Sequence, residues 1–163
     1  MSDTWQENEF DEQKLQQVAA LNPADIRLKA MDLLARRDHS RQELMQKLLR
    51  RFKDADLIDE QLDRLVAENL QSDTRFAEAF LCHRFNRGYG PRRIFQEMQK
   101  KGIAEEEIQA AMDAGAFDWH ANAEHVLSRK YGTARAEDIN EKARRSRFMQ
   151  YRGFSSDQFR DIL

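Results

Sequence analysis

Few side chains in this sequence are spaced for catalysis or metal binding. His120 and His125 are five residues apart, whereas a helix brings together ligands that are three or four residues apart. Cys82 and His83 are adjacent, so on a helix they point about 100° apart and cannot act as a nucleophile and its base. We expect these histidines and His39 to be partly exposed, and Cys82 to be a small packing residue. The sequence therefore predicts no catalytic residue, no metal site and no cofactor.

Two further motifs resemble functional ones only in part. Residues 88–90 read Gly-Tyr-Gly, but they lack the preceding strand, the third glycine and the Gly-Lys-Ser/Thr element of phosphate-binding loops. Residues 105–107 are all glutamate, which is typical of the first turn of a helix, where carboxylates complement the helix dipole. We therefore predict a protein that is not an enzyme.

Basic residues are the distinctive chemical group, because they gather in three segments although the formal net charge of the chain is −2. The net charge is +5 over residues 36–53, +5 over residues 84–101 and +4 over residues 141–152. Such a surface suits a phosphate backbone or an acidic groove on a protein. A solvated face whose lysine and arginine stems cover apolar edges is the alternative. The candidate binding residues are Arg41, Lys47, Arg50, Arg51, Arg84, Arg87, Arg92, Arg93, Lys100, Lys101, Arg144, Arg145, Arg147 and Arg152.

The segments that contain these cations are predicted to be helices. Apolar residues recur at helical spacing, and no stretch shows the sustained alternation of a strand. Asn22-Pro23 is a favoured helix start, and Ser40 with Glu43 forms a capping-box pattern in which each would satisfy the other's backbone donor. Further expected starts are Asp73, Pro91, Asp118, Asp138 and Ser155, and expected ends are Gly88, Gly102, Gly115, Gly132 and Gly153.

One spacing of apolar residues occurs three times. The anchors Leu57, Ile103 and Phe154 are 46 and 51 residues apart, and each is followed five residues later by Leu62, Ile108 or Phe159. Nine residues before the anchors stand Leu48, Ile94 and, as a departure, Arg145. The repeat predicts an all-α fold of three tandem three-helix repeats in an elongated, curved array, in which the middle helices could form a basic ridge. The expected repeats are residues 22–70, 71–115 and 116–163.

The composition fits thin, well-hydrated units. The 163 residues are 40% hydrophobic and 34% charged, and the mean hydropathy is −0.85. No apolar run is long enough to span a membrane, and one cysteine excludes an internal disulfide. Residues 1–21 are an acidic N-terminal tail without the basic start of a signal peptide, so we expect a cytoplasmic protein. We read the tail as poorly ordered or as a marginal helix, and we expect its removal to leave stability unchanged.

Several short motifs resemble the RecX family of bacterial regulatory proteins when their order and spacing are taken together. They stand at residues 37–44 (RDHSRQEL), 73–77 (DTRFA), 88–94 (GYGPRRI), 101–103 (KGI) and 151–154 (YRGF). The resemblance runs from about residue 26 to residue 163. It departs from the family at residues 69–72 (NLQS), where a Gly-Tyr pair often precedes the Asp-x-Arg-Phe motif, and it does not extend to the acidic tail.

The resemblance implies tandem three-helix units and a role in DNA repair, homologous recombination and the SOS response. RecX-like proteins bind RecA filaments on DNA along the helical groove, and they suppress strand exchange, ATP hydrolysis and co-protease activity. It leaves open whether DNA is contacted within the complex. We expect a monomer that has no membrane partner. A single-stranded DNA-binding protein that acts without RecA is the alternative, and a scaffold for another helical partner ranks below both.

Overall fold

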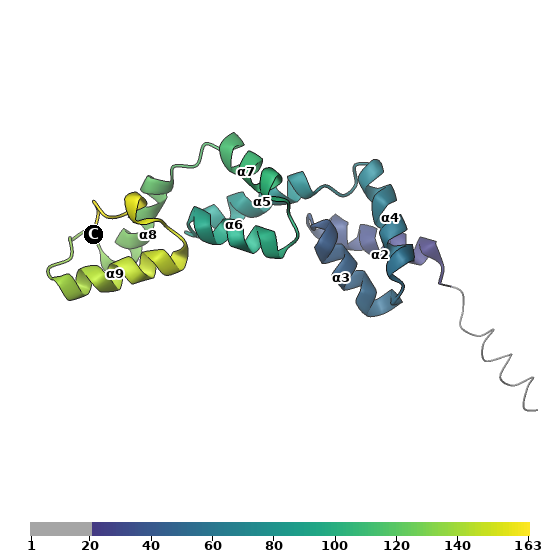
Figure 1. Ribbon diagram of the computed structural model, residues 1–163, viewed down its shortest axis with the longest axis horizontal. Coiled ribbons are helices and arrows are strands. Elements are labelled where there is room, and N and C mark those ends of the chain that lie inside the picture. Colours follow the sequence, from purple (N-terminus) through teal and green to yellow (C-terminus); the bar gives the residue numbers. More distant parts are fainter. Residues whose placement is uncertain (1–20) are drawn as a thin grey trace, which may run out of the picture.

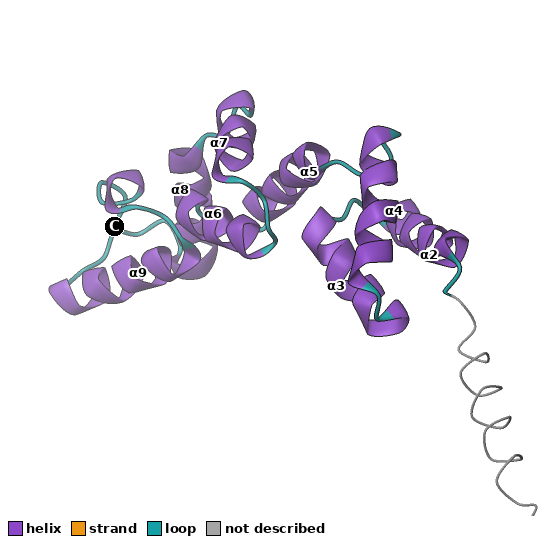
Figure 2. Cartoon of the chain, turned by 45° about the vertical axis from the view of Figure 1, so that its right-hand side comes forward, coloured by secondary structure: helices purple, strands orange, loops and turns teal. Residues whose placement is uncertain are grey.

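The computed structural model describes residues 21–163, and over these residues it consists of helices and loops without a strand (Figure 2). Three groups of helices follow one another along the long axis of the molecule in a slightly arched array (Figure 1). The predicted all-α fold of three-helix repeats is confirmed. The helices are α2 (Pro23–Arg36), α3 (Arg41–Phe52), α4 (Ala55–Ala67), α5 (Asp73–Asn86), α6 (Pro91–Lys100), α7 (Glu105–Ala114), α8 (Trp119–Tyr131), α9 (Ile139–Arg152) and the 3₁₀ turn η1 (Ser156–Gln158).

Each repeat has its own hydrophobic core. Helices α2–α4 enclose the first, α5–α7 the second, and α8, α9 and the segment around η1 the third. The anchors Ile103 and Phe154 are buried, whereas Leu57 is only half-buried at the edge of the first core. The residues five positions after the anchors are all buried. Separate small cores make each repeat depend on the joints with its neighbours.

The third repeat replaces its last α-helix with a 3₁₀ turn. The predicted capping box is present, because the Ser155 side chain accepts from the Gln158 backbone and the Gln158 side chain accepts from the Ser155 backbone N–H. One turn is enough to direct Phe159 into the third core, where it is buried. The chain therefore closes this core without a full helix.

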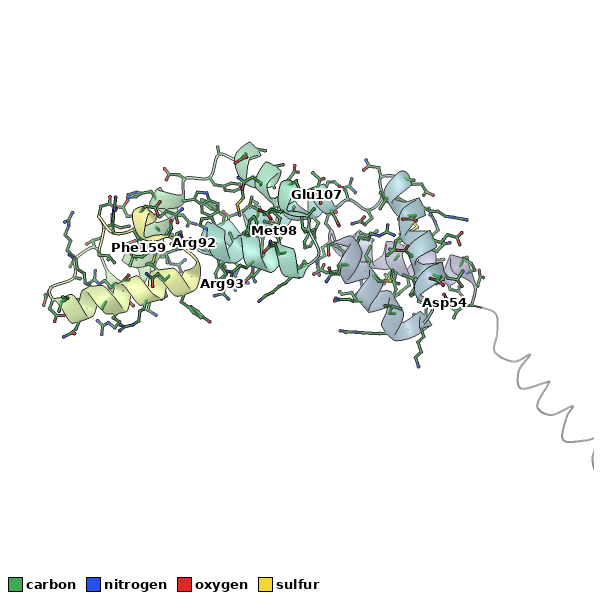
Figure 3. All side chains as sticks on the ribbon, viewed as in Figure 1. Asp54, Arg92, Arg93, Met98, Glu107 and Phe159 are labelled. Atoms are coloured by element: carbon green, nitrogen blue, oxygen red, sulfur yellow. The ribbon has the colours of Figure 1, made fainter. Side chains whose placement is uncertain are left out.

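Most predicted helix boundaries agree with the structure. The side chain of Asn22 accepts from the backbone N–H of Ala24. Gly102 has a left-handed φ of 80°, and the backbone N–H of Ile103 donates to the carbonyl oxygen of Met98 at 3.2 Å, which completes a Schellman turn. Figure 3 shows Met98 on α6, where its side chain is buried in the second core.

Three local predictions were wrong. Ser72, and not Asp73, caps α5. Cys82 is exposed and is not a packing residue. His39 is buried with 3% of its surface exposed, because it lies at the joint between the first two repeats. The predicted tail lies outside the described residues except for Leu21, which is half-buried against the first core. Among residues 21–163, none of the helices combines the length and the apolar character needed to cross a bilayer.

Candidate functional site

The middle helices of the three repeats stand end to end. The C-terminus of α9 meets the N-terminus of α6, where the backbone N–H of Gly90 donates to the carbonyl oxygen of Arg152 at 2.8 Å and that of Arg92 donates to Gly153 at 3.1 Å. The first N–H groups of a helix have no partner within that helix, so the carbonyl groups of α9 satisfy donors that α6 leaves free. The Gly-Tyr-Gly segment is thus part of a joint between repeats.

A second joint connects α6 to α3. The Ser40 hydroxyl donates to the carbonyl oxygen of Lys101 at 2.7 Å, and Gln42 Nε2 donates to that of Lys100 at 3.3 Å. Helices α9, α6 and α3 therefore run in one direction along one edge of the molecule, as Figure 1 shows. We call this arrangement the middle-helix row. In it the helix dipoles are aligned head to tail, which is their favourable arrangement.

Eight of the fourteen candidate cations are exposed, and seven of these lie on the middle-helix row. Within the described part of the chain, seven of the eight form no ion pair, and Arg144 has only a 3.8 Å contact with Glu141. The row thus presents cations along all three repeats, whereas Arg87 follows α5 and lies outside it. The exposed cations are Lys47, Arg50, Arg51, Arg87, Arg92, Lys100, Arg144 and Arg147.

Three of the other cations hold neighbouring helices together. Arg84 of α5 and Arg93 of α6 both pair with Glu97, at 2.6 and 3.0 Å. Arg93 also donates to the carbonyl oxygen of Tyr151, and Figure 3 places Arg92 and Arg93 at the end of α6 next to the third repeat. Arg41 pairs with two aspartates of α4. These side chains are half-buried, so they contribute more to architecture than to a free basic surface.

Arg145 does not lie on an exposed face. It is 5% exposed, pairs with Glu141 at 2.6 Å and donates to the carbonyl oxygen of Ala134 at 2.7 Å. It occupies the position held by Leu48 and Ile94 in the other repeats, which are both fully buried. The repeat register was therefore a signal that Arg145 points inward, and charge counting alone missed it.

Lys101 belongs to a partly buried polar cluster at the joint of the first two repeats. Its ammonium group donates to Glu43 at 2.5 Å, and Arg37 donates to the other carboxylate oxygen at 3.1 Å. His39 Nδ1 lies 3.2 Å from the same carboxylate. The capping box is thus only half formed. The Ser40 hydroxyl accepts from the Glu43 backbone N–H, but the Glu43 carboxylate binds these cationic partners.

The cluster also shifts two pKa values. Burial acts to raise the pKa of Glu43, but hydrogen bonds and charges from Lys101 and Arg37 outweigh it and lower the pKa from 4.5 to about 2. Burial, with the charges of Arg37 and Lys47, lowers the pKa of His39 below its ordinary value. His39 is therefore neutral and Glu43 ionised near neutral pH.

We expect the folded state to lose stability in acid through this joint. The contribution of Glu43 is complete above pH 4.5 and is lost as the pH falls from 4.5 toward 2, because the unfolded chain binds the proton first. His39 acts in the same direction below pH 6.5. Glu43→Gln is expected to cost about 1–3 kcal/mol at pH 7. Urea unfolding between pH 7 and pH 3 measures both effects.

The matched control is Glu60→Gln, which removes an exposed pair with Arg64. Such pairs contribute about 0–1 kcal/mol, so the control should keep the pH dependence of the parent. A Glu43→Gln variant with the stability and pH dependence of the parent would show that the cluster around Glu43 does not stabilise the joint.

In the part of the chain that the structure describes, no three histidine, cysteine, aspartate or glutamate side chains are grouped as metal ligands. His120 lies 3.0 Å from Asp161, and this contact is exposed. The chemistry that the row offers is the binding of anions through exposed guanidinium and ammonium groups.

Sequence reasoning missed two cations outside the three basic segments. Arg129 and Lys130 lie in the last turn of α8 and are exposed. Together with Arg87 and Arg152 they line a hollow at the joint of the second and third repeats. Their adjacent positions at a helix end were the available signal, but that placement is also common for dipole reasons alone.

Comparison with known proteins identifies the family. Residues 27–65, 72–112 and 118–163 match the family models for the first, second and third three-helix domains of RecX. The chain is 42% identical over 142 residues to "Regulatory protein RecX" of Ectopseudomonas mendocina, covering 87% of this chain and 95% of that protein. It is 41% identical over 141 residues to the protein of the same name from Pseudomonas putida, covering 86% and 90%.

Two solved structures share the fold. The crystal structure of RecX from Lactobacillus salivarius superposes with a TM-score of 0.71 at 22% identity, over 86% of this chain and 93% of that one. A second crystal structure, of a regulatory protein RecX, gives 0.70 at 23% identity, over 90% and 76%. With three domain matches in order along most of its length, the chain belongs to the RecX family of regulatory proteins.

Proposed function

We propose that this protein is a negative regulator of RecA that binds the RecA–DNA filament along its groove and inhibits recombinase, ATPase and co-protease activity. Family membership supports RecA as the partner. The middle-helix row is the observation that supports this mode of binding. It is elongated and has exposed cations on each repeat, which suits a long, repeating partner with negative charge. In this proposal the chain acts in the cytoplasm as a monomer, without catalysis or a cofactor.

The row supplies the binding residues, and the joints hold its helices end to end. Arg92, Lys100 and Arg147 are exposed and form no ion pair with another described residue, so they are free to meet acidic groups on the filament. Arg93 and Lys101 bind carboxylates within the protein, and reversing their charge would disturb the joints as well as the surface. The decisive variant therefore leaves these two residues unchanged.

Reversal of three row cations is expected to weaken inhibition of the filament. The variant Arg92→Glu/Lys100→Glu/Arg147→Glu should keep the helical circular dichroism spectrum of the parent. Its half-maximal concentration for inhibiting DNA-dependent ATP hydrolysis by RecA should rise at least about tenfold, because like charges then face each other at the interface. Inhibition by the parent should weaken as salt rises.

The control carries the same change in charge away from the row. Arg36 and Arg64 are exposed and form only pairs within their own helices, and Arg135 is exposed in the loop before α9. The triple reversal Arg36→Glu/Arg64→Glu/Arg135→Glu should inhibit about as well as the parent. Equal inhibition by both triple variants would exclude the row from the interface, and no inhibition by the parent would exclude the proposed function.

A further inference from the structure

A cationic hollow lies beside the α9 end of the middle-helix row, where the end of α5 meets α8 and α9. Its volume is about 460 Å³, within the range of about 300–1,000 Å³ that is typical of ligand sites. Four cationic side chains line it, and no carboxylate does. They come from two helices and the residue after α5, in two repeats, and they are Arg87, Arg129, Lys130 and Arg152.

The absence of carboxylates from the lining distinguishes this hollow from the two at which neighbouring middle helices meet. The hollow between α3 and α6 contains Glu43 and Glu97, and the hollow between α6 and α9 contains Glu97. In the described residues, none of the four cations of the cationic hollow forms an ion pair. Like charges that converge without counter-charges repel one another and concentrate a positive potential, which a bound anion relieves.

The hollow is also held in shape. Arg152 Nη1 donates to the carbonyl oxygens of Arg87 at 3.1 Å and Gly88 at 3.3 Å, so its guanidinium group bridges α9 and the end of α5. The Lys130 ammonium group lies 4.4 Å from the centre of the Phe148 ring. Phe148 and Val126 form an apolar wall beside the cations.

We propose that this hollow binds the phosphate backbone of a single strand of nucleic acid, independently of the exposed cations of the row and of RecA. Three of the four cations are arginines, whose parallel N–H groups match two oxygens of a phosphate. The apolar wall offers a surface for the sugar or base that accompanies each phosphate. This assignment goes beyond the proposed function, since it gives the protein a second contact, with the strand itself.

The test is the affinity of the full chain for a fluorescently labelled oligothymidylate, measured by anisotropy over a range of salt concentrations. Arg87→Gln/Arg129→Gln removes two cations whose side chains form no hydrogen bond with another described residue. Each lost phosphate contact on a single strand lowers the log–log salt slope by about 0.7, so two contacts correspond to about 25-fold weaker binding at 0.1 M salt. Arg36→Gln/Arg64→Gln is the control with the same net charge; both residues are exposed, lie outside the row and pair only within their own helices, and we expect this variant to change the affinity less than about twofold.

Three results would overturn this assignment. The first is that the parent does not bind the oligonucleotide at low salt. The second is that the two double variants weaken binding equally. The third is that polyglutamate displaces the oligonucleotide as readily as unlabelled oligothymidylate does, which would indicate an acidic protein segment as the ligand. Inhibition of RecA ATP hydrolysis is measured in parallel. If the parent inhibits RecA but does not bind the strand, the hollow assignment fails and the proposed function stands.

Discussion

Phe154→Ala is expected to lower the free energy of unfolding by about 3–5 kcal/mol, the usual cost of removing a buried phenylalanine. Phe154 is 1% exposed and lies in the third core with Met149 and Phe159. The third repeat has only two α-helices and a 3₁₀ turn to enclose this core, so little neighbouring structure can collapse into the space left by the ring. Urea unfolding followed by circular dichroism measures the change.

Ile139→Ala is the matched control, because Ile139 begins α9 in the same repeat but is 81% exposed. We expect it to change stability by less than about 0.5 kcal/mol. Hydrogen exchange on the Phe154→Ala variant should show the largest loss of protection in α8 and α9, since each repeat has its own core. Unfolding of the variant at the same urea concentration as the parent would contradict the assignment of Phe154 as the anchor of this repeat.

Gly90→Ala is expected to open the joint between α9 and α6 and to cost about 2–4 kcal/mol. A Cβ atom at this position would lie 2.3 Å from the carbonyl carbon of Gly153 and 2.4 Å from the backbone nitrogen of Phe154. Both are backbone atoms, so the clash cannot be relieved by rotating a side chain. The φ of Gly90 is −83°, an ordinary value for alanine, and the cost therefore arises from the approach of the two repeats.

Opening the joint should also change the shape of the molecule. The hydrogen bonds from Gly90 and Arg92 to the end of α9 would be lost, while the three cores stay intact. We expect an unchanged helical spectrum, a lower thermal midpoint and a different distance between spin labels at two exposed sites, one in the second repeat and one in the third. A variant with the midpoint and the label distance of the parent would show that the repeats do not approach each other at Gly90.

If the row is the binding surface, the same variant should also inhibit RecA less well, because the cations of α9 would no longer continue those of α6. The charge of the surface is unchanged in Gly90→Ala, so the variant separates alignment from charge. It thereby complements the triple reversal of Arg92, Lys100 and Arg147.

The sequence by itself determined the helices, the threefold repeat and the family. Helix caps such as Asn22 and Asp118, and the left-handed turn at Gly102, depend on residues two to five positions apart, and such local interactions can be read along the chain. The anchors Ile103 and Phe154 were found because a core position recurs with the repeat. The segments rich in cations were equally visible, since composition needs no geometry.

Only the tertiary structure decided which cations are free and what joins the repeats. Lys101 meets Glu43 across 58 residues, and Asp73 accepts from the backbone N–H of Arg41 across 32. Arg145 is buried. The exposed Arg129 lines the same hollow as cations from two repeats. The patterns of charged, capping and apolar residues indicate where a helix begins and ends and which of its faces is buried. Whether a side chain meets a carboxylate, a carbonyl group or water depends on which helix end lies beside it, and this is set by the packing of segments that are distant in the chain.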